Sequence, residues 1–221
     1  MKSVIFDLDG TLADTSGDLI AAANACFREL GFDDILDPEH DQRTAVLGGR
    51  AMLRLGYERL GVVQDSNSVD ENYQLLLKAY ARDIDRHTML YPGCVRAVTA
   101  LGRSGIGVGV CTNKPEALAE DLLEKLGVRG LFGPVIGADT LPVSKPDPAP
   151  LWAAIDRLGG DRGTSVLVGD SVTDRETARG AGAKSLLVTF GPDGRGVEKL
   201  APDALLHHYD DLAKVVAELF G

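Results

Sequence analysis

Val4-Ile5-Phe6-Asp7-Leu8-Asp9-Gly10-Thr11 is an apolar run that ends in two carboxylates two residues apart, followed by a glycine. Residues i and i+2 of an extended chain point to the same side, so Asp7 and Asp9 should face one crevice where the run stops. In open α/β sheets, ligands bind at this carboxyl edge of the strands. One carboxylate can act there as a nucleophile, and the other as its acid/base partner. The alternative is a buried strand followed by a polar Asp-Gly turn whose acids are only solvated.

The composition is that of a globular protein with an acidic charge balance. The chain has 221 residues, of which 44% are hydrophobic and 25% charged, and this suits one large domain or a core domain with a smaller insertion. The formal net charge is −10, and no block of Lys and Arg stands out. This weighs against a nucleic-acid partner or a membrane surface. Carboxylates do suit a divalent cation.

The cysteines indicate a reducing compartment. Cys26, Cys94 and Cys111 are odd in number and widely spaced, without paired or metal-ligand spacing, so we expect free thiols. The acidic N-terminal segment has no apolar stretch long enough for a signal peptide, and no run approaches membrane-spanning length. The expectation is a cytoplasmic enzyme.

Apolar residues at helical spacing predict that the segment from about residue 16 to 86 is entirely helical. The predicted helices cover residues 15–31, about 41–47, a stretch that begins after Gly48-Gly49 and includes Leu60, and about 70–86. Because this block is inserted just after the first strand, we expect it to form a cap over that strand's carboxyl end. The predicted domains are therefore a core of residues 1–15 and 87–221 and a helical cap of residues 16–86.

From residue 91 onward, short apolar runs alternate with helical segments. The predicted strands cover residues 106–111, 135–137, 164–168 and 185–189, and helices lie between them and at 209–219. This alternation predicts βαβ units, hence an α/β fold with a parallel, doubly wound, Rossmann-like sheet.

Three more polar clusters follow predicted strands: Thr112-Asn113-Lys114, Lys145-Pro146-Asp147-Pro148 and Gly169-Asp170-Ser171-Val172-Thr173-Asp174. A parallel sheet brings the ends of these strands to one edge, together with Asp7 and Asp9. So many carboxylates in one place repel one another unless a cation lies among them. Mg²⁺ prefers carboxylate, carbonyl and water oxygens, so the sequence predicts a Mg²⁺ site.

Each cluster also has a purely structural explanation. The residues before Pro115 can simply cap a helix N-terminus. The segment around Lys145 can be a rigid solvent-exposed loop, and Asp170-Ser171 can be an ordinary strand-to-helix turn with Ser171 as the cap. The joint occurrence of the polar clusters at the ends of strands favours one common site.

In their order and spacing, four motifs of this chain resemble those of the haloacid dehalogenase superfamily: Asp7-Leu8-Asp9-Gly10-Thr11, Thr112, Lys145 and Gly169-Asp170-Ser171-x-x-Asp174. With its second aspartate, Asp9, the first motif resembles that of the phosphatase and phosphomutase branch. Dehalogenases of the superfamily lack this second acid, and its P-type ATPases carry Lys at the same position. Within this branch, the chain looks most like phosphoglycolate phosphatases with a helical cap, on the segments Asp14-Thr15, Thr112-Asn113-Lys114, Lys145-Pro146 and Gly169-Asp170-Ser171. The resemblance implies a Mg²⁺-dependent phosphatase that acts on a small phosphomonoester, with phosphoglycolate as the favoured substrate.

The resemblance also implies roles for the site residues. Asp7 would attack phosphorus to form an aspartyl-phosphate, and Asp9 would act as acid and then as base. Thr112 would donate a hydrogen bond to the phosphoryl group, and Lys145, with Mg²⁺, would neutralise its charge. The implied metal ligands are Asp7, the backbone carbonyl of Asp9, Asp170 and Asp174, the last of which would bind the ion or orient its water.

Three further residues are candidates for substrate binding. Arg50 follows two glycines between predicted cap helices, and its planar fork suits the carboxylate of phosphoglycolate. A solvated arginine at a helix start explains it equally well. Asn113 and Lys114 adjoin Thr112 and are expected to line the pocket, although helix capping also accounts for them.

Two other functions stay open at this stage. The same core can pass the phosphoryl group back to a sugar, which would make the protein a phosphomutase similar to β-phosphoglucomutase. A non-catalytic phosphate-binding module is the third candidate. The sequence leaves the oligomeric state undetermined.

Overall fold

Six parallel strands form the central sheet in the structure, a computed structural model that describes residues 1–62 and 66–221, without the side chains of residues 66–68. The strand order is β5-β4-β1-β6-β7-β8. The strands are β1 (Ser3–Phe6), β4 (Gly107–Cys111), β5 (Val135–Ile136), β6 (Ser165–Gly169), β7 (Lys184–Val188) and β8 (Ala204–Leu206). The predicted parallel α/β sheet is confirmed.

The position of β1 explains its continuous apolar sequence. It pairs with β4 on one side and with β6 on the other, and all four of its residues are buried. Its register places Phe6 beside Val110 and Val168. The three strands therefore end at nearly the same level, and the polar residues that follow each of them emerge at one edge.

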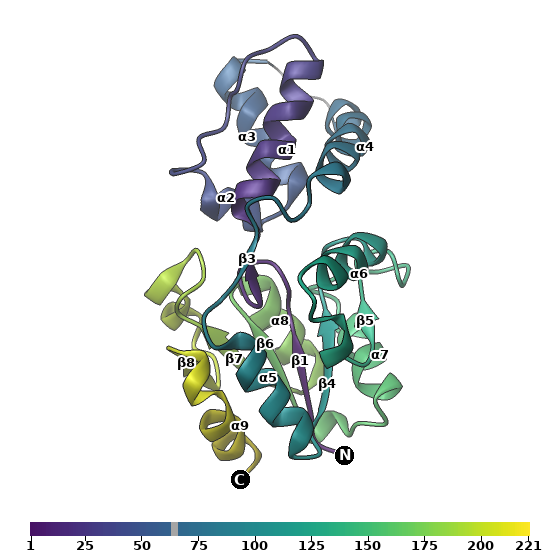
Figure 1. Cartoon of the computed structure of the whole chain (residues 1–221), viewed down its shortest axis with the longest axis vertical. Helices are drawn as coiled ribbons and strands as arrows, with labels where there is room; N and C mark the ends of the chain where they lie inside the picture. Colours follow the sequence, from purple (N-terminus) through teal and green to yellow (C-terminus); the bar gives the residue numbers. More distant parts are fainter. Residues whose placement is uncertain (63–65) are drawn as a thin grey trace. The chain divides into compact units, whose positions relative to one another are not determined.

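Helices cover both faces of this sheet. Figure 1 shows α5 (Cys94–Arg103) and α9 (Leu212–Phe220) together on one face, while α7 (Ala149–Arg157) and α8 (Val172–Ala181) pack on the other. α6 (Glu116–Lys125) packs beside β5. Short 3-10 helices lie in the connections at η1 (Arg129–Leu131), η2 (Arg162–Thr164), η3 (Gly194–Leu200) and η4 (Tyr209–Asp211). Sheets covered on both faces consist of near-continuous apolar strands, as observed here.

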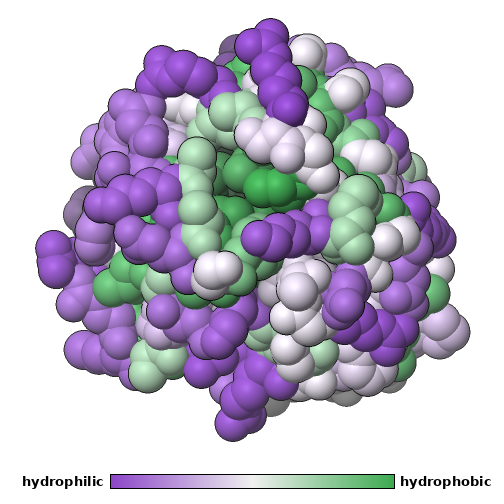
Figure 2. Space-filling model, turned by 90° about the horizontal axis from the view of Figure 1, so that it is seen from below, coloured by the Kyte–Doolittle hydropathy of each residue, from purple (hydrophilic) through white to green (hydrophobic). Residues whose placement is uncertain are grey.

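The two termini lie at the end where the strands begin. Figure 2 shows this face, on which mostly hydrophilic side chains surround a hydrophobic hollow. Because all strands of the sheet are parallel, their carboxyl ends, and the polar clusters, lie at the opposite edge.

The chain divides into two compact units, a core unit of residues 1–14 and 90–221 and a helical unit of residues 15–89. The helical unit contains α1 (Ser16–Glu29), α2 (Gln42–Val46), α3 (Gly49–Leu60) and α4 (Ser66–Arg82). Its helices pack around buried apolar residues, among them Phe27, Met52 and Tyr80. A two-stranded sheet of β2 (Ala13–Asp14) and β3 (Met89–Leu90) marks the two connections between the units.

The fourth helix differs from the sequence prediction, because it begins and ends about four residues earlier than expected. The buried carboxylate of Asp18 accepts hydrogen bonds from the backbone N–H groups of His87 and Thr88 and from the Thr88 hydroxyl, at 2.8 to 3.0 Å. These bonds offer the backbone an alternative to the helix. The residues directly after the predicted helix end are thus held against α1.

The sequence analysis also missed the short strands β2, β3 and β8, each of which has only two or three residues. Among the described residues, no helix is long and apolar enough to cross a membrane.

Candidate active site

The core unit alone brings together the six predicted catalytic and metal-binding residues. Asp7 follows β1, Thr112 follows β4, and Asp170 follows β6. Lys145 lies in the loop before α7, and Asp174 lies in the first turn of α8. The remaining member, Asp9, lies two residues beyond Asp7 and belongs to the same loop.

A buried ammonium group links two of the carboxylates. Lys145 Nζ lies 3.1 Å from Asp7 Oδ1 and donates to Asp174 Oδ1 at 2.7 Å. Its side chain is 1% exposed, so solvent screens these interactions little. Ser144, Pro146 and Asp147 around it are exposed, so the loop faces solvent as the alternative expected, but the Lys145 side chain itself points into the protein.

A third carboxylate completes an acidic cluster of Asp7, Asp170 and Asp174. One oxygen from each residue lies within 4.8 Å of one oxygen from each of the others. Opposite ligands of an octahedral Mg²⁺ are about 4.2 Å apart, because each bond is about 2.1 Å long. A small contraction of the cluster would therefore suit this ion, and three carboxylates against one ammonium leave an excess of negative charge for it to neutralise.

The pKa values reflect this excess of buried negative charge. Burial raises the pKa of Asp7 from 3.8 to about 6, and although Lys145 opposes the shift, Asp174 and Asp9 add to it. Burial, with Asp174 and Asp7, raises the pKa of Asp170 well above its ordinary value. Burial by itself would lower the pKa of Lys145, but Asp174 and Asp7 outweigh it and raise that pKa. Lys145 therefore remains an ammonium at neutral pH.

Asp174 has a second role in the local backbone. Its Oδ2 accepts hydrogen bonds from the N–H groups of Asp170 and Ser171 and from the Ser171 hydroxyl, at 3.2, 3.1 and 2.6 Å. Ser171 caps α8 in a capping box with Asp174. The predicted helix cap is thus present, and the same carboxylate that completes it also binds Lys145.

Two glycines let the backbone approach these carboxylates. A Cβ on Gly169 would lie 2.3 Å from Cβ of Asp174, and a Cβ on Gly10 would lie 2.4 Å from Asp170 Oδ2. Gly10 also has a φ of +75°, which favours glycine. The glycines of both motifs are therefore needed for the close packing of the cluster.

The residues after β4 do not cap α6 through their side chains. The carboxylate of Asp139 accepts from the backbone N–H of Glu116 at 2.8 Å instead. Lys114 Nζ lies 3.0 Å from Asp9 Oδ1, and the Lys114 side chain is 3% exposed. Asn113 Nδ2 donates to the carbonyl oxygen of Lys145 at 3.0 Å. Both side chains thus contact residues of the site rather than the helix end.

Thr112 is nearly fully buried beside them. Its backbone N–H donates to the Ile136 carbonyl at 2.9 Å, and its hydroxyl accepts from the Lys114 N–H at 3.2 Å. These bonds hold the turn after β4 in place.

The sequence analysis quoted Thr11 as part of the first motif but gave it no role. The structure shows that the Thr11 hydroxyl donates to Asp170 Oδ1 at 2.9 Å, and that the residue is fully buried. Its position two residues beyond Asp9 was the available signal. A threonine side chain in a turn commonly bonds to nearby backbone, so the sequence did not indicate a partner 159 residues away.

Arg50 lies in the helical unit, as the second residue of α3. Its Nε donates to Asp70 Oδ1 at 2.7 Å, and its guanidinium carbon lies 3.8 Å from the centroid of the Tyr73 ring. The side chain remains 46% exposed. The guanidinium is thus oriented by α4 residues while part of it stays accessible to solvent.

Comparison with known proteins gives matches along most of the chain. Residues 4–188 match the family model described as haloacid dehalogenase-like hydrolase. A phosphoglycolate phosphatase of Agrobacterium fabrum is 34% identical over 218 residues, which cover 98% of this chain and 91% of that protein. One of Rhodospirillum rubrum is 37% identical over 220 residues, which cover 97% of this chain and 89% of that protein.

A solved structure shares the fold. The crystal structure of a predicted phosphoglycolate phosphatase from Haemophilus somnus superposes with a TM-score of 0.86 at 23% identity. The match covers 97% of each chain. At this identity the likeness concerns the fold alone.

The excess negative charge of the cluster leads to a prediction about stability without metal. In EDTA at about pH 7.5, Asp7→Asn should be more stable to urea than the wild type. The substitution removes one of three buried carboxylates, while Lys145 retains its ion pair with Asp174. Folding raises the pKa of Asp7, so the folded wild type takes up a proton between about pH 6 and pH 4 and gains stability relative to the variant as the pH falls. The advantage of the variant should therefore disappear by about pH 4.

Asp203→Asn is a control of opposite sign. Burial opposes ionisation of Asp203, but hydrogen bonds from Ser185 and Lys184 outweigh it and lower its pKa. This carboxylate stabilises the fold at neutral pH and loses its effect as the pH falls, so its variant should be less stable than the wild type at about pH 7.5. A loss of stability in both variants at that pH would contradict the account of the cluster.

Proposed function

The chain belongs to the haloacid dehalogenase-like hydrolase family, and on this premise we propose that it is a Mg²⁺-dependent phosphatase of small phosphomonoesters, with phosphoglycolate as the favoured substrate. The observation that carries the proposal is the buried group of Asp7, Asp170, Asp174 and Lys145 at the end of β1. The substrate is suggested by the relatives named phosphoglycolate phosphatases, which match along nearly the whole chain.

Asp7 is the proposed nucleophile. Its pKa of about 6 leaves it ionised at neutral pH, and its Oδ1 is oriented by the Leu8 N–H at 2.7 Å and by Lys145. In the first step an Asp7 oxygen bonds to phosphorus as the bond from phosphorus to the ester oxygen breaks. In the second step water attacks phosphorus, which releases phosphate and restores the carboxylate.

Asp9 is the proposed acid and base of these two steps. It donates a proton to the leaving ester oxygen, and then accepts one from the attacking water. Because Asp7 and Asp9 are two residues apart at the end of an extended segment, both can serve one phosphorus atom. The ammonium of Lys114, 3.0 Å from Asp9, fixes the position of this carboxylate.

Four residues that follow the strands are assigned to the phosphate and its pocket. Lys145 neutralises their charge from within the cluster, and the Thr112 hydroxyl donates a hydrogen bond. Asn113 donates to the Lys145 carbonyl, so it lies where it can line the pocket. Lys114 supplies a second ammonium for the same anion.

The metal would be held by Asp7, Asp170, Asp174 and the backbone carbonyl of Asp9. When bound, Mg²⁺ neutralises charge on the phosphate and lowers the repulsion that the Asp7 carboxylate meets as it approaches. Thr11 holds the Asp170 carboxylate in place through its hydroxyl.

The helical unit is the proposed cap, and it would supply substrate specificity. Within this unit, Arg50 is the proposed residue that binds the carboxylate of phosphoglycolate. Its guanidinium is already held by Asp70 and Tyr73, so it loses little conformational freedom on binding. The three buried free cysteines suit a reducing compartment, so we place the enzyme in the cytoplasm. Its proposed partner is a small-molecule phosphomonoester, with no nucleic acid or membrane.

A panel of phosphorylated metabolites tests the function. With Mg²⁺, the wild type should release inorganic phosphate from phosphoglycolate with the highest kcat/KM of the panel, and EDTA should abolish the activity. Asp7→Asn should lose all detectable turnover while it keeps the circular dichroism of the wild type. Transfer of phosphate between the positions of a hexose phosphate, without net release, would instead identify a phosphomutase. Substantial Mg²⁺-dependent hydrolysis by Asp7→Asn would remove Asp7 from its role.

Arg50→Ala tests the assignment of the substrate carboxylate. A charge-assisted fork contributes roughly 1.5–3 kcal/mol, so kcat/KM for phosphoglycolate should fall by about ten- to a hundred-fold. An aryl phosphate has no such carboxylate and should be hydrolysed almost as before. Arg82→Ala is the control, because this exposed arginine lies about 18 Å further along α4 than Asp70. Equal losses on both substrates in Arg50→Ala would indicate a structural role.

A further inference from the structure

Tyr209 connects the C-terminal part of the core unit to the loop that follows β1. Its side chain is almost fully buried, and its hydroxyl donates to the carbonyl oxygen of Thr11 at 2.8 Å, across 198 residues of sequence. The Thr11 hydroxyl in turn donates to Asp170 Oδ1 at 2.9 Å. Two successive contacts thus lead from Tyr209 to a carboxylate of the acidic cluster.

The Thr11 carbonyl belongs to a tight turn. The carbonyl of Leu8 accepts from the N–H groups of Leu12 and Ala13, and the N–H of Gly10 donates to the Ala13 carbonyl, at 2.9 to 3.1 Å. Asp9 lies inside this turn, and Asp7 lies directly before it. A hydrogen bond to the Thr11 carbonyl therefore acts on the backbone that carries both proposed reacting carboxylates.

Aromatic packing supports Tyr209 from the sheet side. Its ring lies 5.2 Å from that of Phe190, which lies 4.9 Å from that of Tyr91. Gly191, the residue after Phe190, approaches the turn that follows β1, since a Cβ on Gly191 would lie 2.7 Å from the Gly10 carbonyl oxygen. The three aromatic rings thus pack together next to the turn that follows β1.

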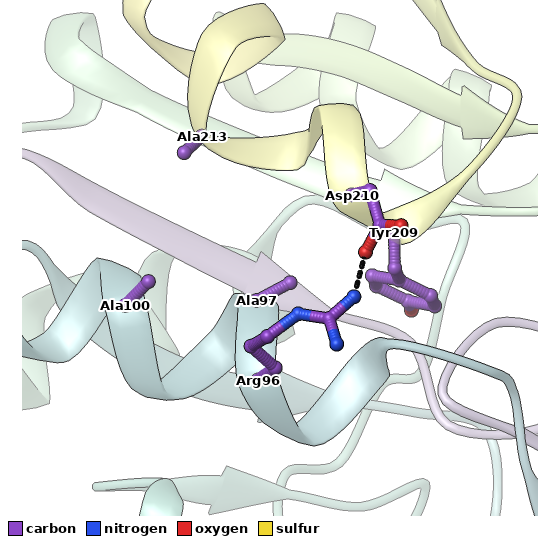
Figure 3. Close-up of a pocket in the computed structure, with 6 residues that line it drawn as sticks. All are labelled: Arg96, Ala97, Ala100, Tyr209, Asp210 and Ala213. Atoms are coloured by element: carbon purple, nitrogen blue, oxygen red, sulfur yellow. Dashed lines mark hydrogen bonds and ion pairs between the residues drawn. The ribbon is translucent and has the colours of Figure 1, made fainter.

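Helix α5 is in contact with η4. Figure 3 shows Arg96 of α5 directed at Asp210, with which it forms an ion pair, and the Tyr209 ring beside them. A Cβ on Gly93 would lie only 3.3 Å from Tyr209 Cβ. A small surface pocket of about 280 Å³ adjoins this contact and is lined by Arg96, Ala97, Ala100, Tyr209, Asp210 and Ala213. Contacts with Gly93 and Phe190 therefore position Tyr209 within the core unit.

We propose that Tyr209 is a positioning residue whose hydroxyl, through Thr11, holds Asp170 in the geometry that binds the divalent cation. The proposal rests on the proposed function, to which it adds a residue remote in sequence from all four motifs. The ring packs against Phe190, whereas the hydroxyl reaches the Thr11 carbonyl and is also hydrogen-bonded with Cys94, the first residue of α5. The hydroxyl matters because it satisfies a buried carbonyl in the loop that carries Asp7 and Asp9.

Tyr209→Phe tests this role, because it keeps the ring and removes only the hydroxyl. Mg²⁺ affinity is measured by isothermal titration calorimetry of the full-length protein without substrate. The loss of one such hydrogen bond should raise the Kd for Mg²⁺ by about three- to ten-fold. In kinetics, the Mg²⁺ concentration for half-maximal activity should rise by a similar factor, while KM for substrate at saturating Mg²⁺ stays unchanged.

Ser165→Ala is the matched control for general destabilisation. Its buried hydroxyl donates to the Asp161 carbonyl at 2.6 Å, at the opposite end of β6 from Asp170. This variant should lower the melting temperature but leave the Kd for Mg²⁺ unchanged. If Tyr209→Phe binds Mg²⁺ as tightly as the wild type, or if both variants weaken binding equally, the proposal is wrong.

Thr11→Val tests the next contact in the chain, between the Thr11 hydroxyl and Asp170. It removes the hydroxyl that holds Asp170 and should weaken Mg²⁺ binding at least as much as Tyr209→Phe. The double variant should lose less than the sum of the two effects, because both act through one chain of contacts. Fully additive effects would refute the coupling. A wild type that binds no Mg²⁺ would count against the proposed function itself, and so against this inference.

Discussion

The ammonium of Lys145, buried between Asp7 and Asp174, is the interaction on which the rest of the site depends. A buried charge is tolerated only when it is paired. Here one ammonium forms ion pairs with two carboxylates of a cluster of three. The surplus of negative charge favours a divalent cation among these carboxylates. The same excess of negative charge destabilises the folded state when no divalent cation is bound. Binding and stability are therefore two consequences of one arrangement of charges.

The sheet and its loops make this arrangement possible. Parallel strands that end at one level deliver Asp7, Thr112 and Asp170 to a single edge, and glycines remove the Cβ atoms that would keep the loops apart. The side chains of the cluster also stabilise the backbone that presents them, as the Asp174 capping box does at the start of α8. Geometry at the site is thus set by local hydrogen bonds as much as by the sheet.

The sequence predicted the parts of this structure that depend on local pattern. The apolar run before Asp7 and the polar residues after each strand identified the sheet and its edge, because strand periodicity and motif spacing are local properties. The course of the segment after α4 depends on Asp18, about seventy residues earlier, and could not be inferred from spacing. The contact between Tyr209 and Thr11 is of the same kind, since a tyrosine in a terminal turn gives no sign of its acceptor.

The most direct measurement of the central claim is the melting temperature of the wild type at about pH 7.5 with Mg²⁺ and with Na⁺ at equal ionic strength. If the acidic cluster needs a divalent cation, Mg²⁺ should raise the melting temperature well beyond the effect of Na⁺, and this difference should be much smaller in Asp170→Asn. Equal melting temperatures of the wild type in the two salts would show that Lys145 alone balances the cluster, and would contradict the account.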